Sequence, residues 1–130
     1  MPMQWEISHD DRLVVIKAAG TVPLVEVEEC YDAMIVADAT SYARLFDASG
    51  LRFKKHGTEE EFMRLGARMS AYAAEFRFGP IAFVCPKPEI RGVIARCLNL
   101  AHAKRPAKIF ATEKRARRWL EQQRAPMVEG

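Results

Sequence analysis

The sequence is poor in the residues and segments that several classes of protein require. Only 7 of its 130 residues are glycine and 7 are proline, which excludes a collagen-like or low-complexity chain. No apolar run approaches the roughly 18 residues that span a bilayer. The first residues also lack the basic start, apolar stretch and cleavage site of a signal peptide. We therefore expect a cytoplasmic protein without a membrane span.

Residues for metal binding or catalysis are equally scarce. The chain has three cysteines, Cys30, Cys85 and Cys97, and three histidines, His9, His56 and His102. The cysteines lack a C-x-x-C spacing and the histidines lie on different predicted elements, so we expect reduced, buried thiols and no zinc site. A Walker loop and a G-x-G-x-x-G motif are also absent from the sequence. We predict no metal, no cofactor and no catalytic residue, and interpret Ser49 and His56 as a turn serine and a solvated loop histidine rather than a nucleophile pair.

Apolar residues, by contrast, are abundant enough for one ordinary domain. They make up 49% of the 130 residues, and a chain of this length buries roughly two thirds of its unfolded surface. We predict a single domain over residues 1–123 and a frayed tail over residues 124–130.

The net charge of +3 conceals an asymmetry along the chain. Residues 1–50 hold three basic and nine acidic residues, whereas residues 51–130 hold seventeen basic and eight acidic ones. We interpret these halves as two oppositely charged surfaces of one domain or as a complementary contact between subunits, so a homodimer is an expectation. The basic residues of 91–124 could meet phosphates, but no RNP or helix-turn-helix pattern accompanies them, and we do not favour nucleic acid as a partner.

Apolar periodicity predicts a mixed sequence of strands and helices. Residues 4–9 and 13–19 are rich in strand-forming side chains and are separated by a polar turn of hairpin length. Thr58 and Glu61 have the spacing of a capping box that opens a helix. The other predicted elements are helices over 24–35, 89–102 and 113–123, strands over 43–47, 79–85 and 107–110, and a loop over 48–57. The order β-β-α-β-α-β-α-β-α predicts an α/β fold with a mixed, mostly parallel sheet on which helices pack.

This order and several local segments resemble the SpoIIAA-like branch of the STAS superfamily, small bacterial proteins related to anti-sigma-factor antagonists and also described as STAS/SEC14-like. The resemblance covers nearly the whole chain. Its local segments are the hairpin ending in Gly20, the strand Arg44-Leu45-Phe46-Asp47 leading into Ala48-Ser49-Gly50-Leu51, the capped second helix, and the ending Ala116-Arg117-Arg118-Trp119-Leu120. The resemblance implies a STAS/SpoIIAA-like fold.

Anti-sigma-factor antagonists dock onto a switch kinase or an anti-sigma factor, and phosphorylation of Ser or Thr at the start of the second helix turns them off. The resemblance therefore implies a regulator or kinase-like protein as partner. The predicted partner-binding residues lie in the loop before the second helix and at its start, and are Ser49, Lys54, Lys55, His56 and Thr58. A phosphate at such a contact adds about two negative charges and can reverse binding.

The position of a phosphoacceptor depends on how the chain is matched to this family. If residues 47–50 match the D-x-S-G segment that ends the third strand, the acceptor position falls near residues 55–57, which carry no hydroxyl, and Thr58 is the nearest candidate. In the other register Ser49 is itself the acceptor. Both remain open, and because Thr58 already caps a helix we favour a module without the standard phosphorylation switch.

The SEC14-like side of the resemblance implies a pocket for a lipid-like, apolar small molecule between the second helix and the sheet. The candidate lining residues are Phe53, Phe62, Met69, Tyr72, Phe76, Phe78 and Phe83. The same apolar periodicity is also what an ordinary core produces, and both interpretations stay open. The sequence thus predicts a non-enzymatic regulatory module that binds a protein, with a carrier or sensor of an apolar ligand as the alternative.

Overall fold

The computed structural model describes residues 3–52, 58–101 and 106–128. In these residues the elements are β1 (Met3–Ser8), β2 (Leu13–Gly20), α1 (Leu24–Val36), β3 (Ala43–Leu51), α2 (Glu59–Glu75), β4 (Ile81–Val84), α3 (Pro88–Ala101), β5 (Ala107–Phe110) and α4 (Glu113–Val128). The predicted order β-β-α-β-α-β-α-β-α and the α/β class are confirmed. No helix among the described residues has the length and apolarity to cross a bilayer.

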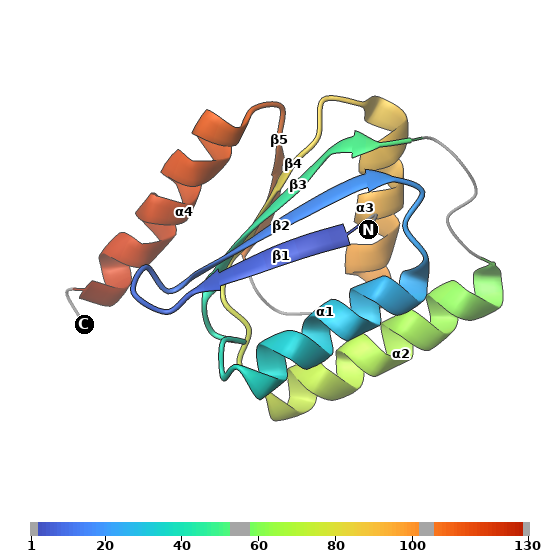
Figure 1. Cartoon of the computed structure of the whole chain (residues 1–130), viewed down its shortest axis with the longest axis horizontal. Coiled ribbons are helices and arrows are strands. Elements are labelled where there is room, and N and C mark those ends of the chain that lie inside the picture. Colours follow the sequence, from blue (N-terminus) through green and yellow to red (C-terminus); the bar gives the residue numbers. More distant parts are fainter. Residues whose placement is uncertain (1–2, 53–57, 102–105, 129–130) are drawn as a thin grey trace.

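The strands form one sheet in the order β1-β2-β3-β4-β5. The hairpin strands β1 and β2 are antiparallel, and every later neighbour pairs in parallel. Each parallel step moves in the same direction across the sheet, so crossovers of one hand place α1, α2 and α3 on the same face. Helix α4 follows the last strand and packs against β3, β4 and β5 on the opposite face (Figure 1).

The two faces of the sheet carry two separate apolar clusters because strand side chains alternate between faces. On the α4 face the buried residues are Ala43, Leu45, Ala82, Val84, Ala116 and Leu120. On the other face Val14, Ile16 and Ala18 of β2 pack with residues of α1 and α3. The next side chains of β3, Arg44 and Phe46, also lie on this second face, which holds the candidate site.

Two elements extend further than the sequence predicts. Strand β3 continues through residues 48–51, which the periodicity places in a loop, because β2 keeps pairing with it as far as Gly20 and Leu51. The pairing shifts register between Lys17 and Ala19, so an irregular step separates the two halves of the ladder. Helix α4 continues to Val128, beyond the predicted end at residue 123.

The predicted capping box at the start of α2 is confirmed. The backbone N–H of Glu61 donates to Thr58 Oγ1 at 3.1 Å, and the backbone N–H of Thr58 donates to Glu61 Oε1 at 3.1 Å. These two bonds satisfy donors that the first turn of a helix otherwise leaves without a partner.

Replacing the cap should weaken the whole fold modestly. We expect Thr58→Ala to lower the free energy of unfolding by about 1 kcal/mol, because it removes the side-chain acceptor at the helix start. Thr58→Ser keeps a hydroxyl and should stay within a few tenths of a kcal/mol of the parent chain. Urea unfolding of the three chains measures the difference, and equal stabilities for the alanine and serine variants would contradict a capping role.

Candidate functional site

A cavity of about 130 Å³ lies between the sheet and the helices α1, α2 and α3. The strands contribute mainly Met3, Ile16, Ala18, Phe46, Ile81 and Phe83. The helices contribute, among others, Cys30, Tyr31, Met34, Leu65, Met69 and Ile94. Protein interiors are close-packed and contain few voids larger than a water molecule. An apolar space of this size is therefore the feature of the fold that most needs an explanation.

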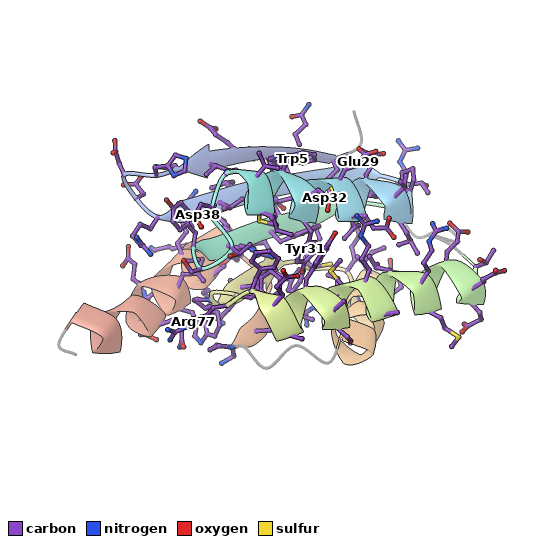
Figure 2. The ribbon with its side chains drawn as sticks, turned by 90° about the horizontal axis from the view of Figure 1, so that it is seen from below. Trp5, Glu29, Tyr31, Asp32, Asp38 and Arg77 are labelled. Atoms are coloured by element: carbon purple, nitrogen blue, oxygen red, sulfur yellow. The ribbon has the colours of Figure 1, made fainter. Side chains whose placement is uncertain are left out.

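The cavity exists because α2 packs mainly on its neighbouring helices rather than directly on the strands. Its apolar contact with α1 is a small cluster of Leu24, Leu65 and Met69, joined by partly buried neighbours. The sheet and α1 line most of the space, and α2 borders it with Leu65 and Met69. Figure 2 shows Tyr31, one of the lining residues, in the region between α1 and α2.

Polar side chains hold α2 against α1 at the rim of the cavity. The guanidinium of Arg68 donates from Nη1 to Glu28 Oε2 at 3.2 Å and from Nη2 to Asp32 Oδ2 at 3.1 Å. Its Nε donates to the Tyr72 hydroxyl at 2.7 Å, and that hydroxyl donates to Asp32 Oδ1 at 2.6 Å. The hydrogen bond to Asp32, together with burial, raises the pKa of Tyr72. Part of the acidic first half of the chain is thus neutralised within the domain.

Arg44 is the one charged side chain among the described residues that line the cavity. It is 1% exposed, and its guanidinium carbon lies 4.9 Å from the ring centre of Tyr31 and 5.0 Å from that of Phe78. Its Nη2 also donates to the backbone oxygen of Thr40 at 3.4 Å. Aromatic faces attract cations, so these contacts hold the guanidinium in place within an apolar setting.

Cys30 also lines the cavity and is 1% exposed. Burial raises the pKa of its thiol from 9.0 to about 12, although the nearby positive charge of Arg44 acts in the opposite direction. At neutral pH the thiol is therefore protonated, and it behaves as a small apolar group rather than as a nucleophile. Cys85 is likewise a free, buried thiol, while the side chain of Cys97 lies outside the described residues.

This pKa predicts how stability responds to alkaline pH. The unfolded chain releases the Cys30 proton near pH 9, whereas the folded chain holds it to about pH 12. The contribution of the buried thiol to the free energy of unfolding is therefore fully present below pH 9 and is lost as the pH rises from 9 to 12. The loss approaches about 1.4 kcal/mol per pH unit within that window. Cys30→Ala removes the titrating group. The difference in unfolding free energy between parent and variant, measured from pH 8 to 11, should shrink as pH rises, and a constant difference would contradict the raised pKa.

The predicted pocket residues fall into three groups. Met69 and Phe83 lie in the lining of the cavity. Tyr72, Phe76 and Phe78 lie outside that lining, because the Tyr72 hydroxyl joins the polar contact with Arg68 and the Phe78 ring covers Arg44. Phe53 and the side chain of Phe62 lie outside the described residues.

The predicted partner-binding and phosphoacceptor residues stay predictions. Ser49 lies in β3, where its backbone N–H and its hydroxyl donate to Asp47 Oδ1 at 3.0 and 2.5 Å. The Thr58 hydroxyl accepts from the backbone of Glu61 in the capping box. Residues 53–57, which include Lys54, Lys55 and His56, lie outside the described residues. In the part of the chain that the structure describes, no group of three His, Cys, Asp or Glu side chains could hold a metal.

Sequence reasoning missed Arg44, Cys30 and Tyr31 as site residues. A signal for Arg44 was present, because an arginine between the apolar residues Ala43 and Leu45 is unusual in a buried strand. Cys30 and Tyr31 carry only the ordinary periodicity of an amphipathic helix. On the opposite face of the sheet, Lys114, Arg115 and Arg118 of α4 are exposed. What binds this basic surface stays a prediction.

No protein-family model matches the sequence, and no curated protein does. A similar solved structure is that of an uncharacterised protein of the DUF3478 family with a SpoIIAA-like fold, from Shewanella loihica PV-4. The similarity covers 91% of each chain, with a TM-score of 0.56 and 22% sequence identity. This chain therefore has the SpoIIAA-like fold that the resemblance implies.

Proposed function

We propose that this protein is a non-enzymatic binding module that takes a small apolar molecule into the cavity beneath α2. The observation that carries the proposal is the apolar lining of a space of about 130 Å³ between the sheet and the helices. An apolar cavity of roughly 150 Å³ is large enough to bind benzene, so the ligand portion that fits here has about six carbon atoms. Of the two functions that the sequence predicts, the cavity supports the apolar-ligand carrier or sensor.

The chemistry of the lining supports binding without a reaction. Cys30, with a pKa of about 12, is protonated at neutral pH and is a poor nucleophile. An arginine side chain is not deprotonated in proteins, so Arg44 offers no general acid or base. The described residues of the lining hold no carboxylate or imidazole that would act as a general base.

The place of α2 supports a sensor rather than a passive carrier. This helix supplies Leu65 and Met69 to the cavity, and its N-cap is Thr58, one of the residues for which the sequence predicts contact with a protein partner. A ligand that fills the space beneath α2 would stabilise its present position. A ligand that binds one conformation better than another shifts the population toward that conformation. Binding in the cavity would therefore be coupled to the surface at the start of α2 that a regulator would contact.

Thermal unfolding in the presence of hexan-1-ol tests the proposal. At ten times its dissociation constant, a ligand that binds the folded chain should raise Tm by about 5 °C. Hexane-1,6-diol has the same length but a hydroxyl at each end, and it should have little effect because one hydroxyl would be buried without a partner. Equal effects of the two alcohols, or none, would contradict an apolar site. Native mass spectrometry of protein from its own host would identify a retained ligand.

A further inference from the structure

We propose that strand β1 pairs with β1 of a second copy of this chain, so that one sheet runs through a two-fold dimer. This inference goes beyond the proposed function, and its test measures association of the chain rather than binding of a ligand. It depends on three features of the described residues: the open outer side of β1, the side chains that β1 carries, and the register in which two copies match.

The two edges of the sheet differ in how well they resist pairing. Edge strands present unpaired backbone N–H and C=O groups, and proteins protect them by short strands, proline and lysine. β5 has these features, because it is four residues long, follows Pro106 and carries the exposed Lys108. β1 (Met3–Ser8) is six residues long, contains neither proline nor lysine, and pairs among the described residues only with β2, without a bulge. It runs along the outer edge of the sheet in Figure 2, open to a further strand.

The side chains of β1 alternate between an apolar and a polar face, as expected for a strand. Met3, Trp5 and Ile7 pack with the core cluster on the α1 face, but Trp5 and Ile7 are only half-buried there. Gln4 and Glu6 are exposed on the other face. A second strand at this edge would cover apolar surface of Trp5 and Ile7 that solvent now reaches, which favours pairing.

The charges and apolar groups of β1 select one register. A two-fold axis makes two copies of the same strand antiparallel, and residues that face each other then lie on the same side of the sheet. The register centred on Trp5 places two aromatic rings side by side, pairs Met3 with Ile7, and pairs Gln4 with Glu6 of the second copy. The register centred on Glu6 would instead bring two carboxylates together, which is unfavourable. The Trp5-centred register is therefore the one that we assign.

Gln4 separates pairing between copies from pairing within one chain. Within the chain it lies opposite Lys17 of β2, whereas in the dimer it faces Glu6 of the second copy. Gln4→Glu therefore improves the pair with Lys17 and repels Glu6 of the second copy, and Gln4→Lys does the reverse. Each contact occurs twice in a two-fold dimer, so Gln4→Lys should tighten the dimer about fivefold and Gln4→Glu should weaken it about fivefold.

Sedimentation equilibrium of the full chain from about 1 μM to about 1 mM measures these dissociation constants. The parent chain should form a weak dimer, with Kd on the order of 100 μM, because two short strands bury less surface than a standard interface. Combining Gln4→Glu with Glu6→Lys should restore pairing to at least the parent level, since opposite charges again face each other.

Gln122 provides the matched control, because it is an exposed glutamine of α4 on the other side of the sheet. Gln122→Lys and Gln122→Glu make the same changes of net charge as the Gln4 variants, and both should leave Kd within about twofold of the parent value. Thermal unfolding at the lowest concentration, where the chain is monomeric, shows whether each variant is folded. Gln4→Glu should be no less stable than the parent chain, since it gains the pair with Lys17.

The outcomes decide for or against the proposal. General repulsion between two chains of net charge +3 predicts the opposite order, with Gln4→Glu the tighter dimer. That order, or equal dissociation constants for the two Gln4 variants, would overturn the pairing through β1. A parent chain that stays monomeric up to about 1 mM would also overturn it, and would leave this edge to a strand of a different protein. If Gln4→Glu does not fold, the tighter dimer expected of Gln4→Lys still decides.

Discussion

Gly79→Ala is expected to lower the free energy of unfolding by about 3 kcal/mol, at the upper end of what one added methyl group costs in a packed site. A Cβ at this position would overlap the backbone carbonyl oxygens of Ser41 and Tyr42. Backbone atoms cannot rotate away as the end of a flexible side chain can. The chain around residue 79 or around residues 41–42 would therefore have to move.

The close approach at Gly79 also positions one wall of the Arg44 site. The backbone N–H of Gly79 donates to Thr40 O at 3.0 Å, and the backbone N–H of Arg44 donates to Pro80 O at 2.9 Å. Phe78, whose ring covers the Arg44 guanidinium, is the preceding residue. A displaced segment would loosen this contact.

Gly92 provides the matched control for this substitution. It lies in the exposed surface of α3, and a Cβ built on it meets nothing within 4 Å. Alanine is the better helix former, so Gly92→Ala should raise the free energy of unfolding by about 0.5–1 kcal/mol. Urea unfolding of both variants gives the comparison. Two variants with effects of the same sign would contradict the packing described around residue 79.

Filling the cavity is expected to weaken binding strongly without harming the fold. Ala18 is buried on β2 and lines the cavity. Ala18→Leu places about three further carbon atoms in that space and should weaken binding of hexan-1-ol about fiftyfold, because each lost methylene contact is worth about 0.8 kcal/mol. The same substitution should raise the free energy of unfolding by about 1 kcal/mol, since the added atoms are buried in a void.

The control for Ala18→Leu is the same change on the other face of the sheet. Ala43 is buried at the start of β3 in the cluster beneath α4, among residues that do not line the cavity. Ala43→Leu should overpack that cluster and lower the free energy of unfolding by about 1–3 kcal/mol, while the folded variant still binds hexan-1-ol. If Ala18→Leu binds as the parent chain does, the cavity is not the binding site.

The order of elements was predictable because local patterns determine it. The capping box of Thr58 and Glu61 and the alternation in the opening hairpin depend on residues close in sequence, and both appear in the structure. The true length of β3 was not predictable in this way. Residues 48–51 are strand because β2 pairs with them, and that pairing joins residues some thirty positions apart.

The site was predictable only in part, for a related reason. Periodicity places Met69 and Tyr72 on the apolar side of one helix, but it does not say what each side chain meets. Met69 points to the cavity, whereas Tyr72 meets Arg68 and Asp32. Whether an apolar helix face is packed or borders a void depends on how far the helix stands from the sheet. That distance is set by tertiary contacts, such as those of Arg68 with α1.

The methionines of this chain allow the most direct test of the central claim, that the cavity beneath α2 binds an apolar ligand. Met3, Met34 and Met69 line the cavity from β1, α1 and α2, whereas Met63 is 66% exposed on α2. In a titration of methyl-labelled protein with hexan-1-ol, the first three methyl resonances should shift together with one dissociation constant while that of Met63 stays in place. Shifts at Met63 alone, or none at the three lining methionines, would contradict the account.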